Sequence, residues 1–229
     1  MERSRMRSAV LGLATIGQAP RIDIVPGMVE HLPRGTQVLQ AGALDGLDAD
    51  TLAAMRPQPG EYVLTSRLAD GSSVTVGRSH VIPLLQAAVT RLEEQGASVL
   101  AILCTGTFPD LASRALLIEP ERLFHAACAG VVGRKRLGSL IPLPAQIPQA
   151  EARWRQVGVD ALVVAASPYG PIDAVAAAAG ELGRAGVAAI ALDCFGFTEE
   201  MRQVVRQESG RPVIMANTYL ARVMAELLS

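Results

Sequence analysis

Two stretches of this chain, GASVLAILCTGTF at residues 96–108 and GVAAIALDCFGFT at residues 186–198, follow one plan. In each, a glycine stands eight residues before a cysteine and another glycine two residues after it, so Cys104 and Cys194 occupy matching places. A glycine stop followed by a short apolar run is typical of a helix that leads into a buried strand. Open α/β sheets bind ligands beyond the carboxyl ends of their strands, and we therefore predict that both thiols face one substrate.

The rest of the chain repeats this alternation of strands and helices. The strand predicted at residues 137–142, LGSLIP, resembles LGLATI in the first predicted strand, Ala9 to Ile16. Alternating strands and helices predict a mostly parallel sheet with both faces covered. Because residues 137–142 resemble the first predicted strand, we expect the second half of the chain to form another sheet of the same kind. We also expect a hairpin around Asp70-Gly71 and a helix over LASRALLI at residues 111–118.

The predicted fold class is therefore α/β, with two pseudo-symmetric lobes, mostly parallel sheets and a cleft between the lobes. With 229 residues, half of them apolar, the chain is long enough to bury a substantial core. We expect the first lobe to comprise residues 1–96 with part of the C-terminal helix, together with residues 97–133. Residues 134–216 form the expected second lobe, and the C-terminal helix, residues 217–229, is expected to pack on the first lobe.

Composition points to a small-molecule ligand. The chain has 21 basic and 22 acidic residues, and no stretch concentrates Lys or Arg as in nucleic-acid binders. No apolar run approaches the roughly 18 residues of a membrane helix. The three cysteines form no CxxC pair and no spacing typical of a disulfide framework, which favours reduced thiols. We expect a soluble, cytoplasmic protein that binds neither nucleic acid nor membranes.

Neither a cofactor nor a metal is expected. The chain has no GKS or GKT phosphate loop, and GLATIG at residues 12–17 lacks the glycine pair of a dinucleotide fingerprint. Cys128 and His125 lie about one helical turn apart but have no further ligands nearby in the sequence, so this pair predicts a core face rather than a metal site.

Residues near the predicted strand ends are candidates for binding the substrate. Most free cysteines are buried core residues, and that alternative applies to both thiols. The repetition of the cysteine motif favours a place for both thiols in a cleft instead. Backbone amides near Cys104 would lower its pKa and hold a substrate carboxylate, and Arg21 and Arg78 offer planar guanidinium groups for the same carboxylate. Asp193 is expected to point away from the cleft. The remaining candidates are Thr15, Gly17, Thr105, Gly106, Thr107, Ser167, Phe195 and Gly196.

Three motifs, TIGQAPR at residues 15–21, LIEPER at 117–122 and LDCFGF at 192–197, resemble the AroM family, which is related to the aspartate/glutamate racemase superfamily. The resemblance runs over nearly the whole chain. It implies a cysteine from each lobe flanking the substrate carbon, and racemisation or isomerisation without a cofactor. Racemases of that superfamily typically follow the first cysteine with Asn-Thr and the second with Thr-His. This chain has Thr-Gly and Phe-Gly there, so we expect different substrate recognition.

Inverting a carbon centre removes a proton from one face and returns one to the other, which requires two groups. The sequence thus predicts a cofactor-independent racemase or isomerase of a small carboxylate or amino-acid derivative, with Cys104 and Cys194 as catalytic residues. Two alternatives stay open. One is a single-cysteine decarboxylase or cis-trans isomerase, and the other is a non-catalytic metabolite-binding protein. A homodimer is expected by analogy with related folds.

Overall fold

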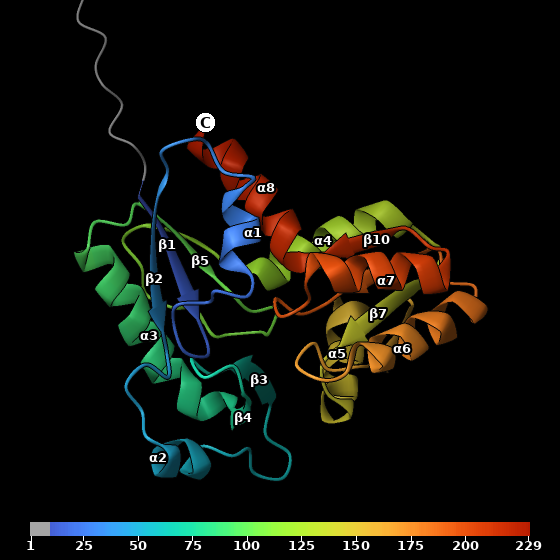
Figure 1. Ribbon diagram of the computed structural model, residues 1–229, viewed down its shortest axis with the longest axis horizontal. Helices are drawn as coiled ribbons and strands as arrows, with labels where there is room; N and C mark the ends of the chain where they lie inside the picture. Colours follow the sequence, from blue (N-terminus) through green and yellow to red (C-terminus); the bar gives the residue numbers. More distant parts are fainter. Residues whose placement is uncertain (1–9) are drawn as a thin grey trace, which may run out of the picture.

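Two parallel four-stranded sheets organise the computed structural model of this protein, which describes residues 10–229 (Figure 1). The first sheet has the order β2-β1-β5-β6. Its strands are β1 (Val10–Thr15), β2 (Gln37–Gly42), β5 (Val99–Ile102) and β6 (Leu116–Ile118). The second sheet has the order β10-β9-β7-β8. Its strands are β7 (Leu137–Ile141), β8 (Ala161–Ala165), β9 (Ala189–Leu192) and β10 (Val213–Met215).

Read from β8, the second sheet repeats the strand order of the first, and the register repeats as well. Gly12 pairs with Leu100 and Gly138 pairs with Ile190, each partner standing four positions before a cysteine. A Cβ at Gly12 would lie 2.2 Å from the Leu100 side chain, and the space beside Gly138 is also tight. The predicted α/β fold with two pseudo-symmetric halves is confirmed.

Helices connect the strands and cover the sheets. Gly96 and Gly186 adopt φ values of +93° and +71° just after the helices that precede β5 and β9, which is the predicted glycine stop. The longer helices are α3 (Arg78–Glu94), α4 (Pro120–Val132), α5 (Ile147–Gln156), α6 (Ile172–Arg184), α7 (Glu199–Ser209) and α8 (Ala216–Leu228). The short ones are α1 (Val25–Val29), α2 (Ala49–Ala54) and the 3-10 turn η1 (Pro144–Gln146).

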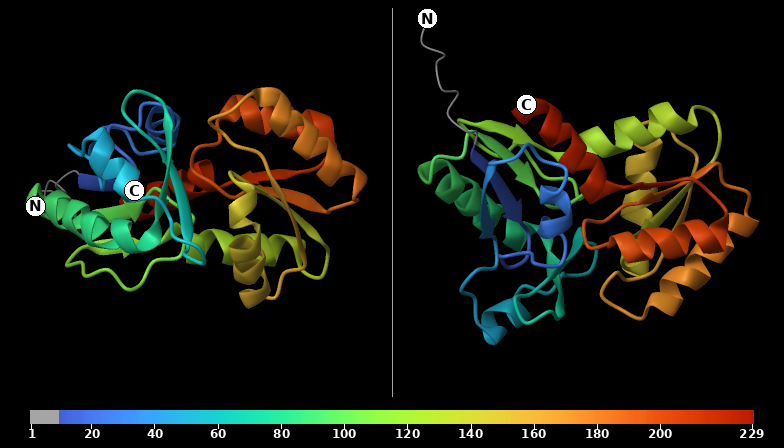
Figure 2. Two further views of the ribbon diagram at one scale, coloured as in Figure 1. Left: turned by 90° about the horizontal axis from the view of Figure 1, so that it is seen from below. Right: turned by 45° about the horizontal axis from the view of Figure 1, so that its top comes forward.

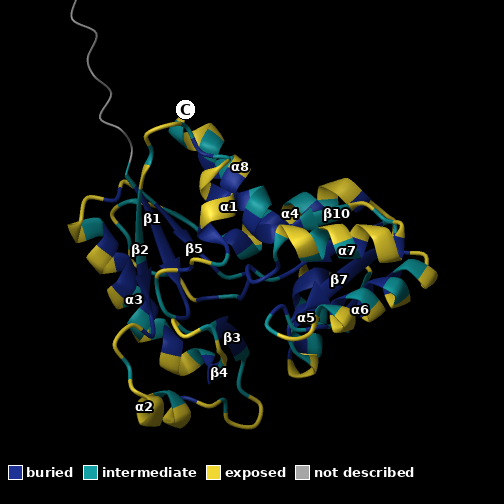
Figure 3. Cartoon of the chain, in the orientation of Figure 1, coloured by how far each residue is buried: buried dark blue, intermediate teal, exposed yellow. Residues whose placement is uncertain are grey.

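The strands of both sheets are largely buried (Figure 3), and their apolar side chains belong to three clusters. Successive residues of a strand point to opposite faces. In β1, Leu11 and Leu13 therefore join a central cluster, while Ala14 joins a cluster with α3. In β9, Ala189 and Ala191 join the same central cluster, and Ile190 joins a third cluster with α6 and α7. The central cluster thus receives one face of each sheet, together with residues of α1, α4, α5 and α8.

A β-hairpin leaves the first half and contacts the second. It consists of β3 (Val63–Arg67) and β4 (Ser73–Gly77), which pair antiparallel as predicted. The backbone N–H of Val63 donates to Gln149 Oε1 at 3.0 Å, and the Val63 carbonyl accepts from Gln149 Nε2 at 2.8 Å and Gln146 Nε2 at 3.2 Å. The hairpin is therefore bonded to η1 and α5.

The C-terminal helix returns to the first half after β10 has completed the second sheet (Figure 2). There α8 contacts both α1 and α4. The exact lobe boundaries stay a prediction. No helix within residues 10–229 combines the length and the apolar character needed to cross a membrane.

Two elements differ from expectation. Residues 111–115 are not helical, and β6 follows as an edge strand. The carboxylate of Glu93 accepts hydrogen bonds from the backbone N–H groups of Arg114 and Ala115, which these residues therefore do not use in a helix. Helix α7, which is largely polar, was not predicted. Ala9, predicted to begin the first strand, lies outside the described residues.

Candidate active site

The two thiols lie at matching places in one cavity. Cys104 follows the end of β5 by two residues, and Cys194 follows the end of β9 by two. Both line a cavity of about 30 Å³ whose walls come from both halves. The backbone N–H of Gly106 donates to Cys104 Sγ at 3.2 Å, and that of Gly196 donates to Cys194 Sγ at 3.4 Å. The repeated sequence therefore builds the same local contact twice.

Both thiols are held in their protonated form. Burial raises the pKa of Cys104 to about 11, although the Gly106 amide and the charges of Arg153 and Arg21 oppose this change. Burial raises the pKa of Cys194 to about 12, and the nearby Cys104 adds to the increase. Neither sulfur is a thiolate at neutral pH in this closed arrangement.

A hydrogen bond joins the two cysteine segments directly. The hydroxyl of Thr105 donates to the backbone carbonyl of Asp193 at 3.1 Å. Because each residue neighbours a cysteine, this bond fixes the spacing of the two sulfur-bearing loops.

Arg21 is a buried cation in the cavity wall. Its side chain is 2% exposed, and its Nε and Nη2 atoms donate to the carboxylate of Asp23 at 2.9 and 2.8 Å. Burial lowers the pKa of Arg21, but the bond and charge of Asp23 outweigh this effect and keep the pKa above its ordinary value. Asp23 thus occupies one edge of the guanidinium, and Nη1 on the other side contacts Thr15 Oγ1 at 3.4 Å.

A second buried cation, Arg153 of α5, was not predicted. Its Nη1 donates to the Tyr62 hydroxyl at 2.5 Å, and its Nη2 donates to Asp193 Oδ2 at 3.1 Å. His125 Nε2 lies 3.3 Å from the same carboxylate oxygen. Burial raises the pKa of Asp193, but His125 and Arg153 outweigh burial and hold the pKa below its ordinary range. Asp193 is therefore an ionised carboxylate at neutral pH.

Asp193 follows the end of β9 and is one of the residues around the cavity. Its side chain is buried, and its carboxylate contacts Arg153 and His125. That this side chain points away from the cleft stays a prediction. The next helix, α7, is capped by Thr198, whose hydroxyl accepts the N–H of Met201.

Tyr169 closes the cavity from the loop after β8. Its hydroxyl lies 3.5 Å from Arg21 Nη2, and burial raises its pKa, so the phenol is neutral. The ring packs against Gly196, where a Cβ would lie 2.6 Å from the Tyr169 hydroxyl oxygen. Ser167 accepts the N–H of Tyr169 at 3.1 Å and shapes this loop.

Most of the predicted site residues lie at the cavity. Those in its wall are Cys104, Cys194, Arg21, Thr105, Gly106, Phe195 and Gly196.

Five predicted residues lie outside the wall. Thr15 supports Arg21 and accepts the N–H of Gly17 at 3.2 Å, while Ser167 shapes the Tyr169 loop. Arg78 donates to the carbonyl of Thr107 at 3.0 Å, and its guanidinium lies 4.4 Å from the centre of the Tyr62 ring. The structure thus gives Arg78 a part in holding the loop after Cys104, not a place in the cavity wall.

Several wall residues were missed by the sequence analysis. Apart from Tyr169, they come from the hairpin segment, η1 and α5, which are distant in sequence from both cysteines, so no local pattern connects them. A Pro-Tyr-Gly loop after a predicted strand was the one available signal, for Tyr169. The polar residues missed are Tyr62, Thr65, Ser66, Gln146, Gln149, Arg153 and Tyr169.

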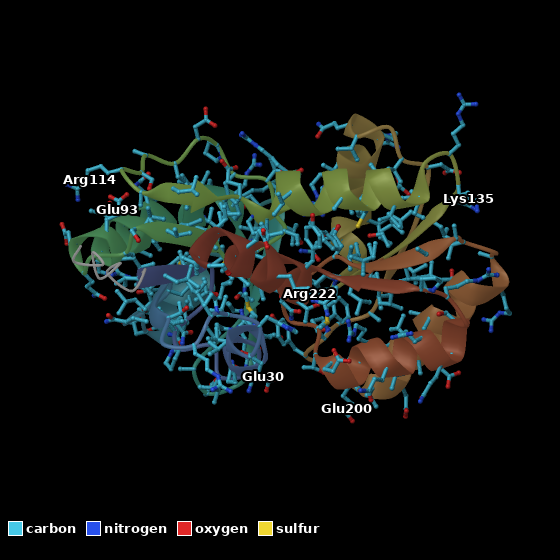
Figure 4. All side chains as sticks on the ribbon, turned by 90° about the horizontal axis from the view of Figure 1, so that it is seen from above. Glu30, Glu93, Arg114, Lys135, Glu200 and Arg222 are labelled. Carbon is cyan, nitrogen blue, oxygen red and sulfur yellow. The ribbon has the colours of Figure 1, made fainter. Side chains whose placement is uncertain are left out.

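The buried charges of the site contrast with those of the surface. Charged side chains such as Lys135 and Glu200 point outward from the ribbon (Figure 4).

Between residues 10 and 229, no group of three His, Cys, Asp or Glu side chains is arranged to hold a metal ion. Cys128 is fully buried in the central cluster.

The fold is shared with solved structures of two racemases and an isomerase. A glutamate racemase from Bacillus anthracis matches with a TM-score of 0.66 at 13% identity, covering 96% of this chain and 81% of the other. Allantoin racemase from Klebsiella pneumoniae matches with a TM-score of 0.61 at 17% identity, covering 96% and 87%. A Nocardia farcinica maleate cis-trans isomerase variant, carrying a covalently bound succinylcysteine intermediate, matches with a TM-score of 0.62 at 14% identity, covering 96% and 92%.

At these identities the likeness establishes the fold alone. No curated protein matches the chain significantly. A family model described as AroM protein matches residues 11–228, which is nearly the whole described chain. This chain therefore belongs to the AroM protein family.

Proposed function

We propose that this protein is a cofactor-independent racemase or isomerase acting on a small carboxylate or amino-acid derivative. Cys104 and Cys194 are the proposed proton-transfer pair. The observation that carries the proposal is the place of both thiols at equivalent strand ends in the wall of one cavity. The racemases that share the fold support the same reaction class.

The proposed reaction conserves protons. One sulfur, as a thiolate, removes the proton from the carbon beside the carboxylate, and the opposite thiol donates a proton to the other face. The first sulfur ends the turnover as a thiol and the second as a thiolate, so the two exchange roles for the reverse reaction. One proton must leave the pair before the first turnover, because both thiols are protonated in the closed state.

The cavity wall supplies charges that favour this chemistry. Arg21 and Arg153 lower the pKa of Cys104, and Arg21 lowers that of Cys194, in opposition to burial. Negative charge develops on the substrate carboxylate as the carbon loses its proton, and preorganised donors that face this charge stabilise it. Arg21 Nη1 is the proposed donor, since the amides of Gly106 and Thr107 already donate to Cys104 Sγ and to the Tyr62 hydroxyl.

The test is deuterium incorporation from solvent into each enantiomer of a panel of small amino acids, hydantoins and carboxylates. Two-thiol catalysis predicts that Cys104→Ser abolishes proton removal from one enantiomer and Cys194→Ser abolishes it from the other. Racemisation should fall at least roughly 100-fold in both variants. Cys128→Ala is the matched control, since Cys128 is buried away from the cavity, and it should racemise like the wild type.

One-thiol chemistry is the second candidate. A thiol with a raised pKa is a proton donor rather than a nucleophile, which suits a decarboxylase that reprotonates its product on one face. The solved cis-trans isomerase with a covalent cysteine intermediate is the other precedent in this fold. Loss of turnover in only one cysteine variant would favour these reactions. Binding without exchange or turnover for any compound would favour a non-catalytic metabolite-binding protein.

A further inference from the structure

The amide that contacts Cys194 belongs to a peptide unit that Asn217 also binds. The N–H of Gly196 donates to Cys194 Sγ at 3.4 Å. The carbonyl of Phe195 is part of the same planar unit, and it accepts a hydrogen bond from Asn217 Nδ2 at 3.0 Å. This peptide bond is trans, so its N–H and its carbonyl point in opposite directions. Asn217 therefore holds one side of the unit while the sulfur contacts the other.

The same side chain also binds the next carbonyl but one along the chain. Asn217 Nδ2 donates to the carbonyl of Phe197 at 2.8 Å. The nitrogen of an asparagine amide carries two hydrogens, so one side chain supplies both bonds, and it must face the carbonyls with its nitrogen because carbonyls only accept. Gly196 thus lies between two residues whose carbonyls are held by one side chain, which is 3% exposed.

The orientation of the Gly196 peptide depends on these bonds. The Phe195 side chain belongs to the central cluster and the Phe197 side chain to the third cluster, so the two rings fix where the segment lies. Gly196 has no side chain of its own, and glycine adopts a wider range of backbone angles than other residues. The bonds from Asn217, at the start of α8, restrict that freedom at the position next to the sulfur.

The segment after Cys104 is held by other side chains. The Thr105 hydroxyl donates to the backbone carbonyl of Asp193 at 3.1 Å, and the N–H of Thr107 donates to the Tyr62 hydroxyl at 3.2 Å. Asn217 takes no part in either bond. A change at Asn217 is therefore expected to affect one sulfur and to spare the other.

We propose that Asn217 is a positioning residue for Cys194, because its bonds to the Phe195 and Phe197 carbonyls keep the Gly196 N–H directed at the sulfur. This inference rests on the proposed function, since it treats Cys194 as a proton-transfer group. Burial raises the pKa of Cys194 to about 12, and the Gly196 amide opposes this increase. A hydrogen bond to the charged form favours that form, so the contact supports the step in which Cys194 is a thiolate.

The test measures the reactivity of each thiol in the full chain without a substrate. The thiolate is the nucleophile, so alkylation by iodoacetamide at about pH 9, resolved by peptide mass spectrometry, reports the thiolate at each cysteine. Asn217→Leu keeps a branched side chain of similar size but donates no hydrogen bond. Cys194 should then react at least roughly threefold more slowly, because its thiolate loses a well-directed hydrogen bond. Cys104 should react at the wild-type rate.

A merely structural role of Asn217 would have the opposite effect on the rates. Loosening of the fold would expose the thiols and speed their alkylation. Thr218→Ala is the matched control, since Thr218 follows Asn217 in α8 and its hydroxyl donates to the carbonyl of Met215 at 3.3 Å. It should leave both rates unchanged. Urea denaturation checks that each variant is folded, and Asn217→Ala is the replacement if Asn217→Leu is not.

A second measurement leaves Asn217 in place. Asn217 is the only asparagine of the chain, so labelling with nitrogen-15 asparagine gives one side-chain amide group in the NMR spectrum. Cys194→Ala removes the acceptor from the peptide unit that Asn217 binds, and it should shift this signal. Cys104→Ala should leave the signal where it is.

The outcomes separate this inference from the proposed function. The inference is overturned if Cys194 reacts at the wild-type rate or faster in a folded Asn217 variant, or if the asparagine signal is the same in Cys194→Ala. For a compound that exchanges, Asn217→Leu should slow deuterium incorporation only into the enantiomer whose proton Cys194 removes. Slower alkylation of Cys194, with no exchange by the wild type for any compound, would support the inference and contradict the proposed reaction. Exchange by the wild type, with unchanged alkylation of Cys194 in Asn217→Leu, would do the reverse.

Discussion

The glycines two residues after Cys104 and Cys194 have a packing role besides their amide bonds to sulfur. A Cβ at Gly106 would lie 2.9 Å from the Leu64 side chain and 3.3 Å from Cys104 Sγ. A Cβ at Gly196 would lie 2.6 Å from the Tyr169 hydroxyl oxygen. The spacing seen in the sequence thus lets the hairpin and the Tyr169 loop approach the two sulfurs.

Gly196→Ala should displace Tyr169 from the site. Overpacking of this kind is expected to lower the free energy of unfolding by about 1–3 kcal/mol, measured by urea denaturation. Gly130→Ala is the control, since Gly130 lies within α4 and a Cβ there would meet no atom within 4 Å. That control should be neutral or stabilising by up to about 1 kcal/mol. Equal losses in both variants would contradict the packing argument.

At the scale of residues, the sequence predicted part of the cavity wall. Cys104, Cys194 and Arg21 were expected at a cleft because repetition and guanidinium chemistry are visible in the chain itself, and all three line the cavity. Arg153 and Tyr62 were missed because they meet only after α5 and the hairpin pack together. The partners of Asp193, Arg153 and His125, were missed because they come from α5 and α4, which are distant in the sequence.

At the scale of elements, the hairpin and α5 connect the two halves on one side of the cavity. Gln149 and Arg153 lie one helical turn apart on α5, and both bond to the hairpin segment, at Val63 and Tyr62. The same contacts border the small cavity, because Tyr62, Gln149 and Arg153 all belong to its wall.

Gln149→Ala removes both bonds between this side chain and the Val63 backbone. The Val63 amide should then lose roughly tenfold of its protection in hydrogen exchange, because two hydrogen bonds of ordinary strength no longer hold the hairpin. Gln86→Ala is a close match, since Gln86 makes the same pair of bonds to the Ala112 backbone, both at 2.8 Å. It should expose residues 111–115 and leave the hairpin protected. Unchanged Val63 exchange in Gln149→Ala would contradict the role of this contact.

Most elements followed from periodicity, and the exceptions have physical causes. The segment LASRALLI has helical composition, but Glu93 binds its backbone and Leu116–Ile118 pair with β5. Among the residues of α7, Val205 and Ser209 alone are buried, so its sequence carries little apolar periodicity.

At the scale of the whole molecule, the raised pKa values of the two cavity thiols couple stability to pH. The pKa values of Cys104 and Cys194 are raised to about 11 and about 12, whereas an unfolded thiol titrates near about 8.5. Between these values the folded protein binds more protons than the unfolded chain. The free energy of unfolding should therefore be unaffected by these groups below about pH 8.5 and should fall as pH rises toward 11.

Urea unfolding at pH 7, 8, 9 and 10 measures this slope. The double variant Cys104→Ser, Cys194→Ser should show a flatter fall than the wild type. The fall should not vanish, because burial also raises the pKa of Cys128 and Tyr169. Identical slopes in both proteins would contradict the assigned pKa shifts.

The pseudo-symmetry of the molecule was predictable from the sequence, but the central cluster was not. Repeats reveal that two halves share a plan, while the packing of one half on the other depends on which sheet faces turn inward. Leu11 and Leu13 of β1 and Ala189 and Ala191 of β9 belong to one cluster with α8. No local pattern in these strands distinguishes the sheet face that joins the central cluster from the face that packs against helices of its own half.

Because the central cluster joins the two halves, it determines how either half would behave as a separate chain. A separate half would expose one apolar sheet face to water, and a second copy of the same half is a natural surface to cover it. The two halves have the same strand order, so such a pair would form a symmetric dimer of half-length chains. Each copy would bring one sulfur to the shared cavity. In the single chain, the two halves are covalently linked and stay together at any protein concentration. Separate halves would have to associate, and the fraction associated would depend on their concentration.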